Sequence, residues 1–207
     1  MRKAGLFLPM ILLLLCVGCQ KQQNMEAETL QQEYSRIAQA RITAELTCQY
    51  ETQQRCYTVC CEYRPEQTRL QVLEPQELCG ITATVTGNAL VLSYDGLSLD
   101  AGELSSKEIS PMRALPLLLQ ALQQGYVTSW GEETVGETAC WRLSLDKGSG
   151  DGGEKVYYTL WLDKNTHALC GGEIRLGQRV GLQCRVTEFV WELTANDTGV
   201  TENLGGN

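Results

Sequence analysis

The sequence is poor in the residues that enzyme active sites most often use. Its 207 residues contain a single histidine, His167, which lies in a stretch of turn residues after Asn165. A serine or cysteine nucleophile needs a positioned base, and a lone loop histidine is more typical of solvated surface. Neither Gly-x-Ser-x-Gly nor His-Glu-x-x-His occurs. The sequence therefore predicts that the protein is not an enzyme.

Metal and cofactor motifs are also scarce. Cys56, Cys60 and Cys61 could supply thiolates, but zinc takes four ligands and no second cysteine pair follows at ligand spacing. The Gly-rich segment from Asp146 to Glu154 lacks the alternating oxygen ligands of an EF-hand. We expect no metal and no cofactor.

Basic charge is low, with 17 Lys and Arg against 25 Asp and Glu and a net charge of −8. Phosphate backbones are bound by clustered basic residues, whereas this sequence spreads them singly. Nucleic acid is therefore excluded as a partner. An acidic protein is also repelled by anionic lipid head groups, so membrane attachment would need a covalent lipid.

The sequence has no apolar run long enough to span a bilayer, which takes about 20 residues. The longest run, Leu6 to Val17, follows Arg2 and Lys3 and is interrupted by Pro9. Basic, apolar and small residues in this order are typical of a secretory signal peptide. The run ends in Leu15-Cys16-Val17-Gly18-Cys19, which resembles the lipobox of bacterial lipoproteins. The resemblance implies that Cys19 receives diacylglycerol and anchors the chain to the extracytoplasmic face of a cell membrane.

Composition divides the chain into four parts. We expect residues 1–18 to be the signal peptide and residues 19–25 the lipidated cysteine with a polar tether. Residues 26–194 are long enough for one domain with a single core. Residues 195–207 are polar and Gly-rich, and we expect them to be disordered.

Eight cysteines fall in the expected domain, which permits 105 disulfide pairings that sequence does not separate. If the chain is exported, the cysteines can form disulfides. Alternatively they are reduced and serve as small buried apolar residues, because cysteine is generally among the most buried residue types. Both interpretations stay open. Cys60 and Cys61 are adjacent on an expected strand and so point to opposite faces.

Most of the domain has the pattern of β-strands. Turn pairs such as Gly87-Asn88 and Asp95-Gly96 predict tight antiparallel hairpins, and alternation of apolar with polar residues predicts one buried face. The expected strands are Ile42–Glu51, Cys56–Tyr63, Arg69–Leu73, Ile81–Thr86, Ala89–Tyr94, Leu97–Leu99, Glu132–Val135, Thr138–Asp146, Lys155–Asp163, Ala168–Leu176 and Arg179–Leu193.

Two helices interrupt this pattern. Residues Glu26 to Ala40 carry a short apolar stripe at helical spacing. A second helix follows Ser110-Pro111 and runs to Gln124, with leucines at helical spacing, Pro116 expected within the first turn, and Gly125 as its end. We expect this helix to lie across the sheet.

The order of these segments resembles the LolA/LolB-like lipoprotein carrier superfamily, over nearly all of Glu26 to Leu193. The resemblance rests on the first helix running into a strand, the Ser110-Pro111 helix, the passage Glu132 to Trp141, and the hairpin Tyr158 to Thr166 followed by Glu173 and Ile174. It implies a mainly β fold: a strongly curved antiparallel half-barrel whose concave side is closed by the N-terminal and mid-chain helices. Germination-type lipoproteins of spore formers are among the relatives it implies.

Two functions stay open. In the first, the concave face binds a lipid or other hydrophobic ligand for handover or sensing at the cell envelope, and a deep dry cavity would favour it. In the second, the domain is an interaction module that docks an envelope or spore-germination partner, and a filled core with an exposed apolar patch would favour it. The expected ligand-binding residues of the first function are Leu115, Leu118, Leu119, Leu122, Val85, Leu92 and Leu160.

Overall fold

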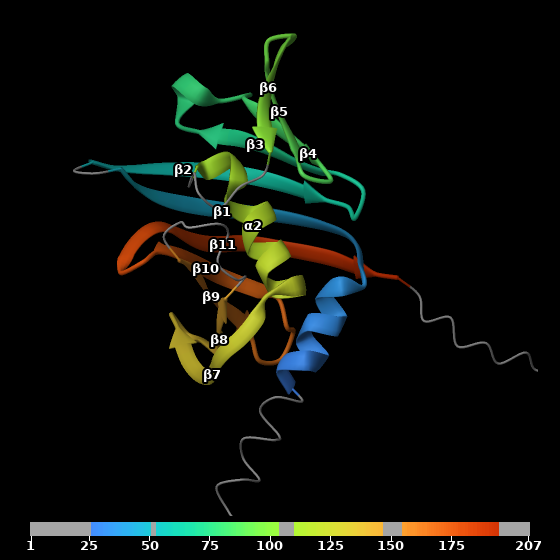
Figure 1. Cartoon of the computed structure of the whole chain (residues 1–207), viewed down its shortest axis with the longest axis vertical. Coiled ribbons are helices and arrows are strands. Elements are labelled where there is room, and N and C mark those ends of the chain that lie inside the picture. The colour runs from blue at the N-terminus through green and yellow to red at the C-terminus, as the bar shows by residue number, and fades with distance from the viewer. Residues whose placement is uncertain (1–25, 51–52, 104–109, 147–154, 195–207) are drawn as a thin grey trace, which may run out of the picture.

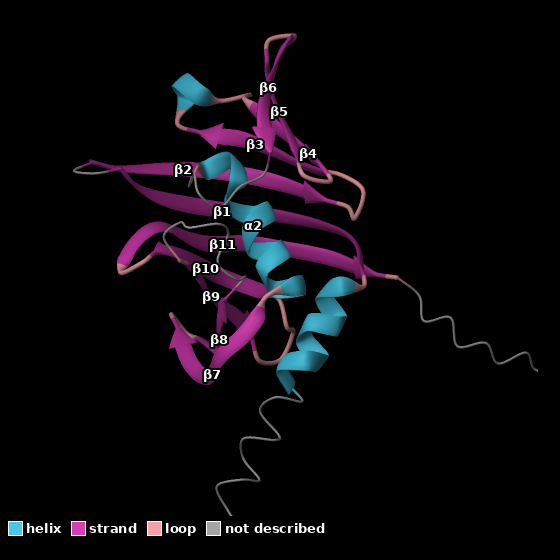
Figure 2. Ribbon diagram, in the orientation of Figure 1, coloured by secondary structure: helices cyan, strands magenta, loops and turns pink. Residues whose placement is uncertain are grey.

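The computed structural model describes residues 26–50, 53–103, 110–146 and 155–194. These residues form one antiparallel sheet with eleven strands and two α-helices (Figures 1 and 2). The signal peptide, Cys19, the tether, the C-terminal tail and most of the Gly-rich segment after Asp146 lie outside the described residues.

The strand order across the sheet is β6-β5-β4-β3-β2-β1-β11-β10-β9-β8-β7, so the first and last strands of the chain pair at its centre. The β1–β11 register runs from Ile37 opposite Leu193 to Cys48 opposite Leu182. The strands are β1 (Ile37–Tyr50), β2 (Gln53–Tyr63), β3 (Thr68–Glu74), β4 (Thr82–Thr86), β5 (Ala89–Tyr94), β6 (Leu97–Glu103), β7 (Tyr126–Val135), β8 (Thr138–Asp146), β9 (Val156–Asp163), β10 (Leu169–Leu176) and β11 (Arg179–Leu193).

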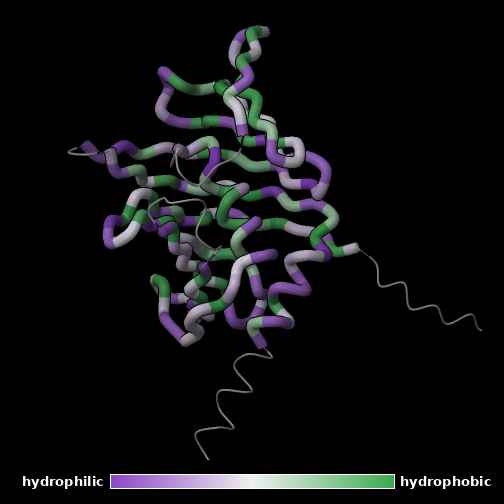
Figure 3. The backbone as a smooth tube through the Cα atoms, in the orientation of Figure 1, coloured by the Kyte–Doolittle hydropathy of each residue, from purple (hydrophilic) through white to green (hydrophobic). Residues whose placement is uncertain are grey.

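Local sequence accounts for the hairpins. Asp95 and Gly96 both have positive φ, at 48° and 77°, which is the backbone of a two-residue turn whose twist matches the flanking strands. Hydrophobic residues, green in Figure 3, alternate with hydrophilic ones along the long strands. In β1 the buried residues Ile42, Ala44 and Leu46 therefore share one face of the sheet, here called the inner face.

Helix α2 (Pro111–Gln124) joins β6 to β7, which are the two opposite edges of the sheet. Its path therefore crosses the inner face (Figure 1), where it contacts β1, β2, β3, β4, β8, β9 and β11. Pro111 occupies the first helical position, where a missing N–H is harmless. Pro116 lies inside the helix and not in its first turn as predicted, so the carbonyl of Met112 lacks its usual helical donor.

Two further expectations need correction. The N-terminal helix covers residues 26–35 and does not reach Ala40, because Ile37 already pairs with Leu193 at the sheet's centre. The sheet is also not strongly curled, contrary to the expected half-barrel (Figure 1). The side chains of α2 pack with those of the sheet in one hydrophobic core. The edge strands β6 and β7 do not pair with each other, so the sheet stays open.

Candidate functional site

The seven residues expected to bind a ligand all lie in or against the hydrophobic core. Six are buried, with exposed fractions of 5% or less, and Leu92 is half-buried against the same core. Leu115, Leu118, Leu119 and Leu122 come from α2, Leu160 from β9 and Val85 from β4. The structure therefore brings this set together, but as packed side chains.

The contact between α2 and β10 shows how closely these side chains pack. Gly172 of β10 lies beneath Leu118, and a Cβ placed on this glycine would be 2.8 Å from Leu118 Cδ1 and 3.3 Å from Leu160 Cδ2. Real Cβ atoms essentially never approach another carbon to 2.8 Å, so a side chain at position 172 would require the end of Leu118 to shift. The inner face beneath Leu118 is filled by protein.

Beyond the cover of α2, the inner face stays apolar and becomes exposed. Along β5 exposure rises from Leu90, at 1%, through half-buried Leu92 to Tyr94, at 54%. On β6, Leu99 pairs with Leu92 and Leu97 pairs with Tyr94, and these leucines are 65% and 76% exposed. Tyr94, Leu97 and Leu99, here called the hairpin patch, thus continue the inner face into solvent.

One buried arginine holds this hairpin to α2. Arg113, only 7% exposed, donates from Nη1 to the carbonyl of Glu103 at 2.7 Å and from Nη2 to that of Ala101 at 3.1 Å. These carbonyls belong to the edge strand β6. Arg113 therefore fixes one end of β6 and leaves the Leu97 end projecting.

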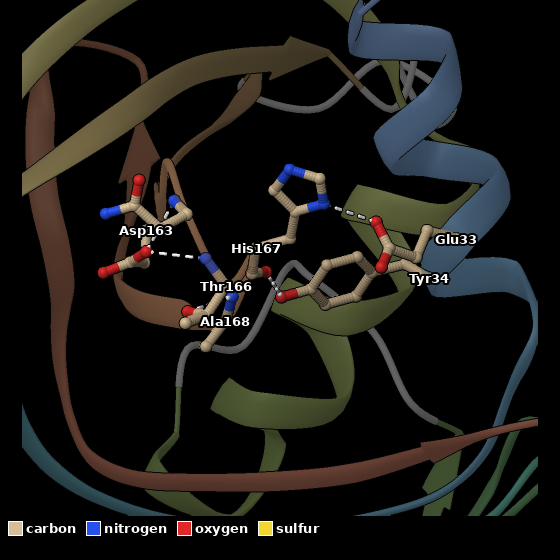
Figure 4. Close-up of polar contacts among 7 residues, drawn as sticks. Glu33, Tyr34, Asp163, Thr166, His167 and Ala168 are labelled. Carbon is tan, nitrogen blue, oxygen red and sulfur yellow. Dashed lines mark hydrogen bonds and ion pairs between the residues drawn. The ribbon is translucent and has the colours of Figure 1, made fainter.

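At the other side of the molecule, the N-terminal helix is tied to the β9–β10 turn (Figure 4). Glu33 Oε2 lies 2.6 Å from His167 Nδ1, and the buried Tyr34 donates its hydroxyl to the His167 carbonyl at 2.7 Å. Burial raises the pKa of Tyr34 well above its ordinary value, so this hydroxyl stays a donor. His167 is therefore a structural tie and not simply a solvated loop residue.

The eight domain cysteines are all free thiols in this structure. Cys61 is buried and Cys60 half-buried, as opposite strand faces require. Within the described residues, no group of three or more His, Cys, Asp or Glu is placed to hold a metal ion. The part of the chain that the structure describes also contains no helix long and apolar enough to cross a membrane.

Proteins with a similar architecture are found among solved structures. Neither a protein-family model nor a curated protein matches the sequence. Solved structures do match, including a LolA superfamily protein from Nitrosomonas europaea with TM-score 0.48 and 9% identity, covering 82% of this chain and 94% of that one. The chain is similar in fold to this LolA superfamily protein. The expected resemblance to LolA-like proteins is thereby confirmed.

Two other solved structures match with comparable scores. The lipoprotein LppX of Mycobacterium tuberculosis matches with TM-score 0.47 and 14% identity over 83% of this chain and 96% of that one. A chain of the Pseudomonas aeruginosa MucA/MucB complex matches with TM-score 0.44 and 13% identity over 83% of this chain and 58% of that one. Similarity at this level concerns the fold, so we infer function from this chain's own side chains.

Sequence reasoning did not select the hairpin patch. It placed Leu97 and Leu99 on a strand, and the alternation along Leu90, Leu92 and Tyr94 was a usable signal for a shared face. What the sequence did not contain was the tertiary packing, which buries Leu90 in the core and leaves Leu97 exposed. The accessible apolar surface therefore lies next to Leu92, one of the seven residues expected to bind a ligand.

Proposed function

We propose that the chain is an exported lipoprotein, held at the extracytoplasmic face of a membrane by diacylglycerol on Cys19, that binds a lipid or other hydrophobic ligand on its inner face. Binding would begin at the hairpin patch and reach Leu92 and Val85 beside α2. The role is one of binding for handover or sensing, because a lipid-anchored protein does not readily leave its membrane.

The observation that supports this proposal best is the exposure of the hairpin patch. Three large apolar side chains stand more than half exposed in one continuous strip, and this strip runs directly into the core. Solvent-exposed apolar strips of this kind in general mark ligand or partner sites. Each leucine covered by a ligand would contribute about 1.5–3 kcal/mol.

The buried leucines of α2 take a second place in this proposal. Because Leu118 sits tightly on Gly172, an acyl chain reaching Leu115, Leu119, Leu122 and Leu160 would require α2 to move away from β10. Pro116 weakens the hydrogen bonding of the helix near its N-terminal half, which is the half closest to β6. Ligand entry from the hairpin patch needs no such movement.

A partner protein is the second candidate, favoured by the position of β6 at the sheet's edge. Arg113 donates to the carbonyls of Ala101 and Glu103. The main chain from Leu97 to Asp100 pairs with β5 on one side and, among the described residues, has no strand on its other side. An extended segment of a partner could add there, with its apolar side chains on Leu97 and Leu99. Envelope or germination-type proteins are the class that this candidate implies.

The deciding experiment is native mass spectrometry with organic extraction on the chain from Gln20 onward, purified without detergent. This chain retains the sheet, both helices and the core, which all lie within residues 26–194. The variant is Leu97→Ser with Leu99→Ser. The matched control is Leu73→Ser, because Leu73 is a leucine that is 37% exposed on the outer face, the face of the sheet opposite α2.

We expect the parent and the control to carry a co-purifying lipid, and the double variant to lose it by at least about tenfold. Equal lipid in all three would contradict a site at the hairpin patch. A parent free of lipid would favour the second candidate, and a pull-down from membranes with parent and double variant would then test it.

A further inference from the structure

We propose that the outer face carries a phosphate-binding site formed by Arg41, Arg64 and Arg69. These arginines line one open hollow of about 500 Å³ where β1, β2 and β11 meet. Arg41 and Arg69 alternate along their strands with buried residues of the inner face, so their side chains lie on the opposite face of the sheet. The site is therefore separate from the hairpin patch of the proposed function.

Strand register brings the three arginines together. Arg41 pairs across β1 and β2 with Glu62, and Glu62 pairs across β2 and β3 with Arg69. Arg64 follows two residues after Glu62, and it also lines the hollow. Neighbouring strands generally lie about 5 Å apart, so Arg41 and Arg69 stand roughly 10 Å apart on either side of Glu62. Arginine side chains are long enough to reach a common ligand across that distance.

Unlike most other arginines among the described residues, these three have no ion-pair or hydrogen-bond partner for their side chains there. Arg142, Arg175 and Arg185 form ion pairs with glutamates, and Arg36 and Arg113 donate to carbonyls. Within the described residues, five arginine side chains make neither an ion pair nor a hydrogen bond, and three of these five line this hollow. They are Arg41, Arg55, Arg64, Arg69 and Arg179.

Charge distribution favours an anion in this hollow. Its walls hold three arginines and two glutamates, Glu62 and Glu192, a balance of +1 in a chain whose net charge is −8. Glu192 also accepts a hydrogen bond from Gln39 Nε2 at 2.7 Å, which reduces its repulsion of an anion. The hollow is thus a local basic site on an acidic protein.

Phosphate matches these groups in chemistry and geometry. A guanidinium group presents paired N–H donors that fit two oxygens of a phosphate, and such charge-assisted hydrogen bonds are generally about twice as strong as neutral ones. Because the hollow is open to solvent, the phosphate group could belong to a soluble phosphate or to a lipid head group. Trp191 lines the same hollow and supplies a fluorescent reporter.

The test measures inorganic phosphate binding to the chain from Gln20 onward by ³¹P NMR line width and by tryptophan fluorescence. Arg69→Gln and Arg41→Gln remove one charge each from the hollow, and Arg55→Gln is the matched control, because Arg55 is an exposed, unpartnered arginine on the same strand as Glu62. We expect each hollow variant to weaken binding about tenfold and the control to be unchanged. Binding should also weaken as salt rises.

Flotation with vesicles identifies the source of the phosphate. Vesicles of phosphatidylcholine with phosphatidylglycerol are compared with vesicles of a phosphate-free glycolipid. Arginine-dependent flotation only with the phospholipid vesicles would assign the site to lipid head groups, whereas phosphate binding without flotation would assign it to a soluble phosphate. Binding that is absent in both assays, or equal in Arg69→Gln and Arg55→Gln, would overturn the proposal.

Discussion

Glu33 and His167 are 134 residues apart in sequence, yet the Oε2 atom of one lies 2.6 Å from the Nδ1 atom of the other. The pair joins the N-terminal helix to the β9–β10 turn, next to the hydrogen bond from Tyr34 to the His167 carbonyl. His167 also has positive φ, at 58°, which is uncommon for a side-chain-bearing residue. The surrounding contacts therefore hold an unfavourable backbone in place.

The first prediction concerns the energy of this pair. Glu33→Gln, His167→Gln and the double variant form a thermodynamic cycle measured by urea unfolding at pH 6. Both side chains are partly exposed, so we expect a coupling of about 0.2–1 kcal/mol. Zero coupling would show that the Tyr34 hydrogen bond and packing suffice to hold the helix.

The second prediction concerns the seat of α2. Gly172→Ala places a Cβ against Leu118, and we expect it to lower the free energy of unfolding by about 1–3 kcal/mol. Gly131→Ala on β7 is the control, because a Cβ there meets nothing within 4 Å. In a double-mutant cycle, Gly172→Ala should cost less in the Leu118→Ala background than in the parent, because the clashing side chain is absent. A Gly172→Ala chain as stable as the control would mean that α2 sits less tightly than described.

The third prediction follows from the turn that carries His167. The pKa of Asp163 is lowered from its ordinary value of 3.8, first by the backbone N–H of Thr166 and also by that of Asn165. A carboxyl group with a lowered folded-state pKa stabilises the fold above about pH 4. That contribution disappears as the pH falls through the lower value. Asp163→Asn should therefore melt below the parent at pH 7, and the two melting temperatures should converge near pH 3.

The fourth prediction concerns thiol reactivity. Burial raises the pKa of Cys184 to about 12 and that of Cys48 to about 11, whereas Cys56 is exposed. Because the thiolate is the reactive form, we expect iodoacetamide at pH 8 to label Cys56 and spare the other two. Peptide mass spectrometry measures the labelling, and unfolding in urea should equalise it. Early labelling of Cys184 in the folded chain would contradict its burial.

The fifth prediction tests the membrane anchor. Cys19→Ala removes the thiol that would carry diacylglycerol, and we expect the expressed chain to lose its lipid modification and mature processing. Metabolic labelling with a fatty acid, followed by membrane fractionation, measures both. Cys56→Ala is the matched control, since Cys56 is an exposed thiol of the folded domain, lies outside the lipobox and should leave labelling intact. A labelled Cys19→Ala chain would rule out Cys19 as the lipid site.

The sequence by itself determined the local elements. The Asp95-Gly96 turn, the alternation in the strands and the leucine spacing before Gly125 predicted hairpins, one buried face and a helix across the sheet, and the structure confirms all three. Each of these signals arises within a few residues, from backbone preferences and from side chains facing the same way. The predicted helix end at Ala40 was wrong because β1 pairs with the distant strand β11 from Ile37 onward. The predicted strand start at Glu132 was wrong because β7 pairs with β8 from Tyr126 onward.

Tertiary structure decided which of these surfaces are available. Leu118 and Leu97 are both leucines on regular elements, yet one lies on Gly172 with no exposed surface and the other is 76% exposed. The difference depends on where α2 crosses the sheet, which no local pattern encodes. Arg41 and Arg69 likewise face one hollow only because β1, β2 and β3 pair in one register. Burial and convergence come from long-range packing, and they separate core residues from candidate sites in this protein.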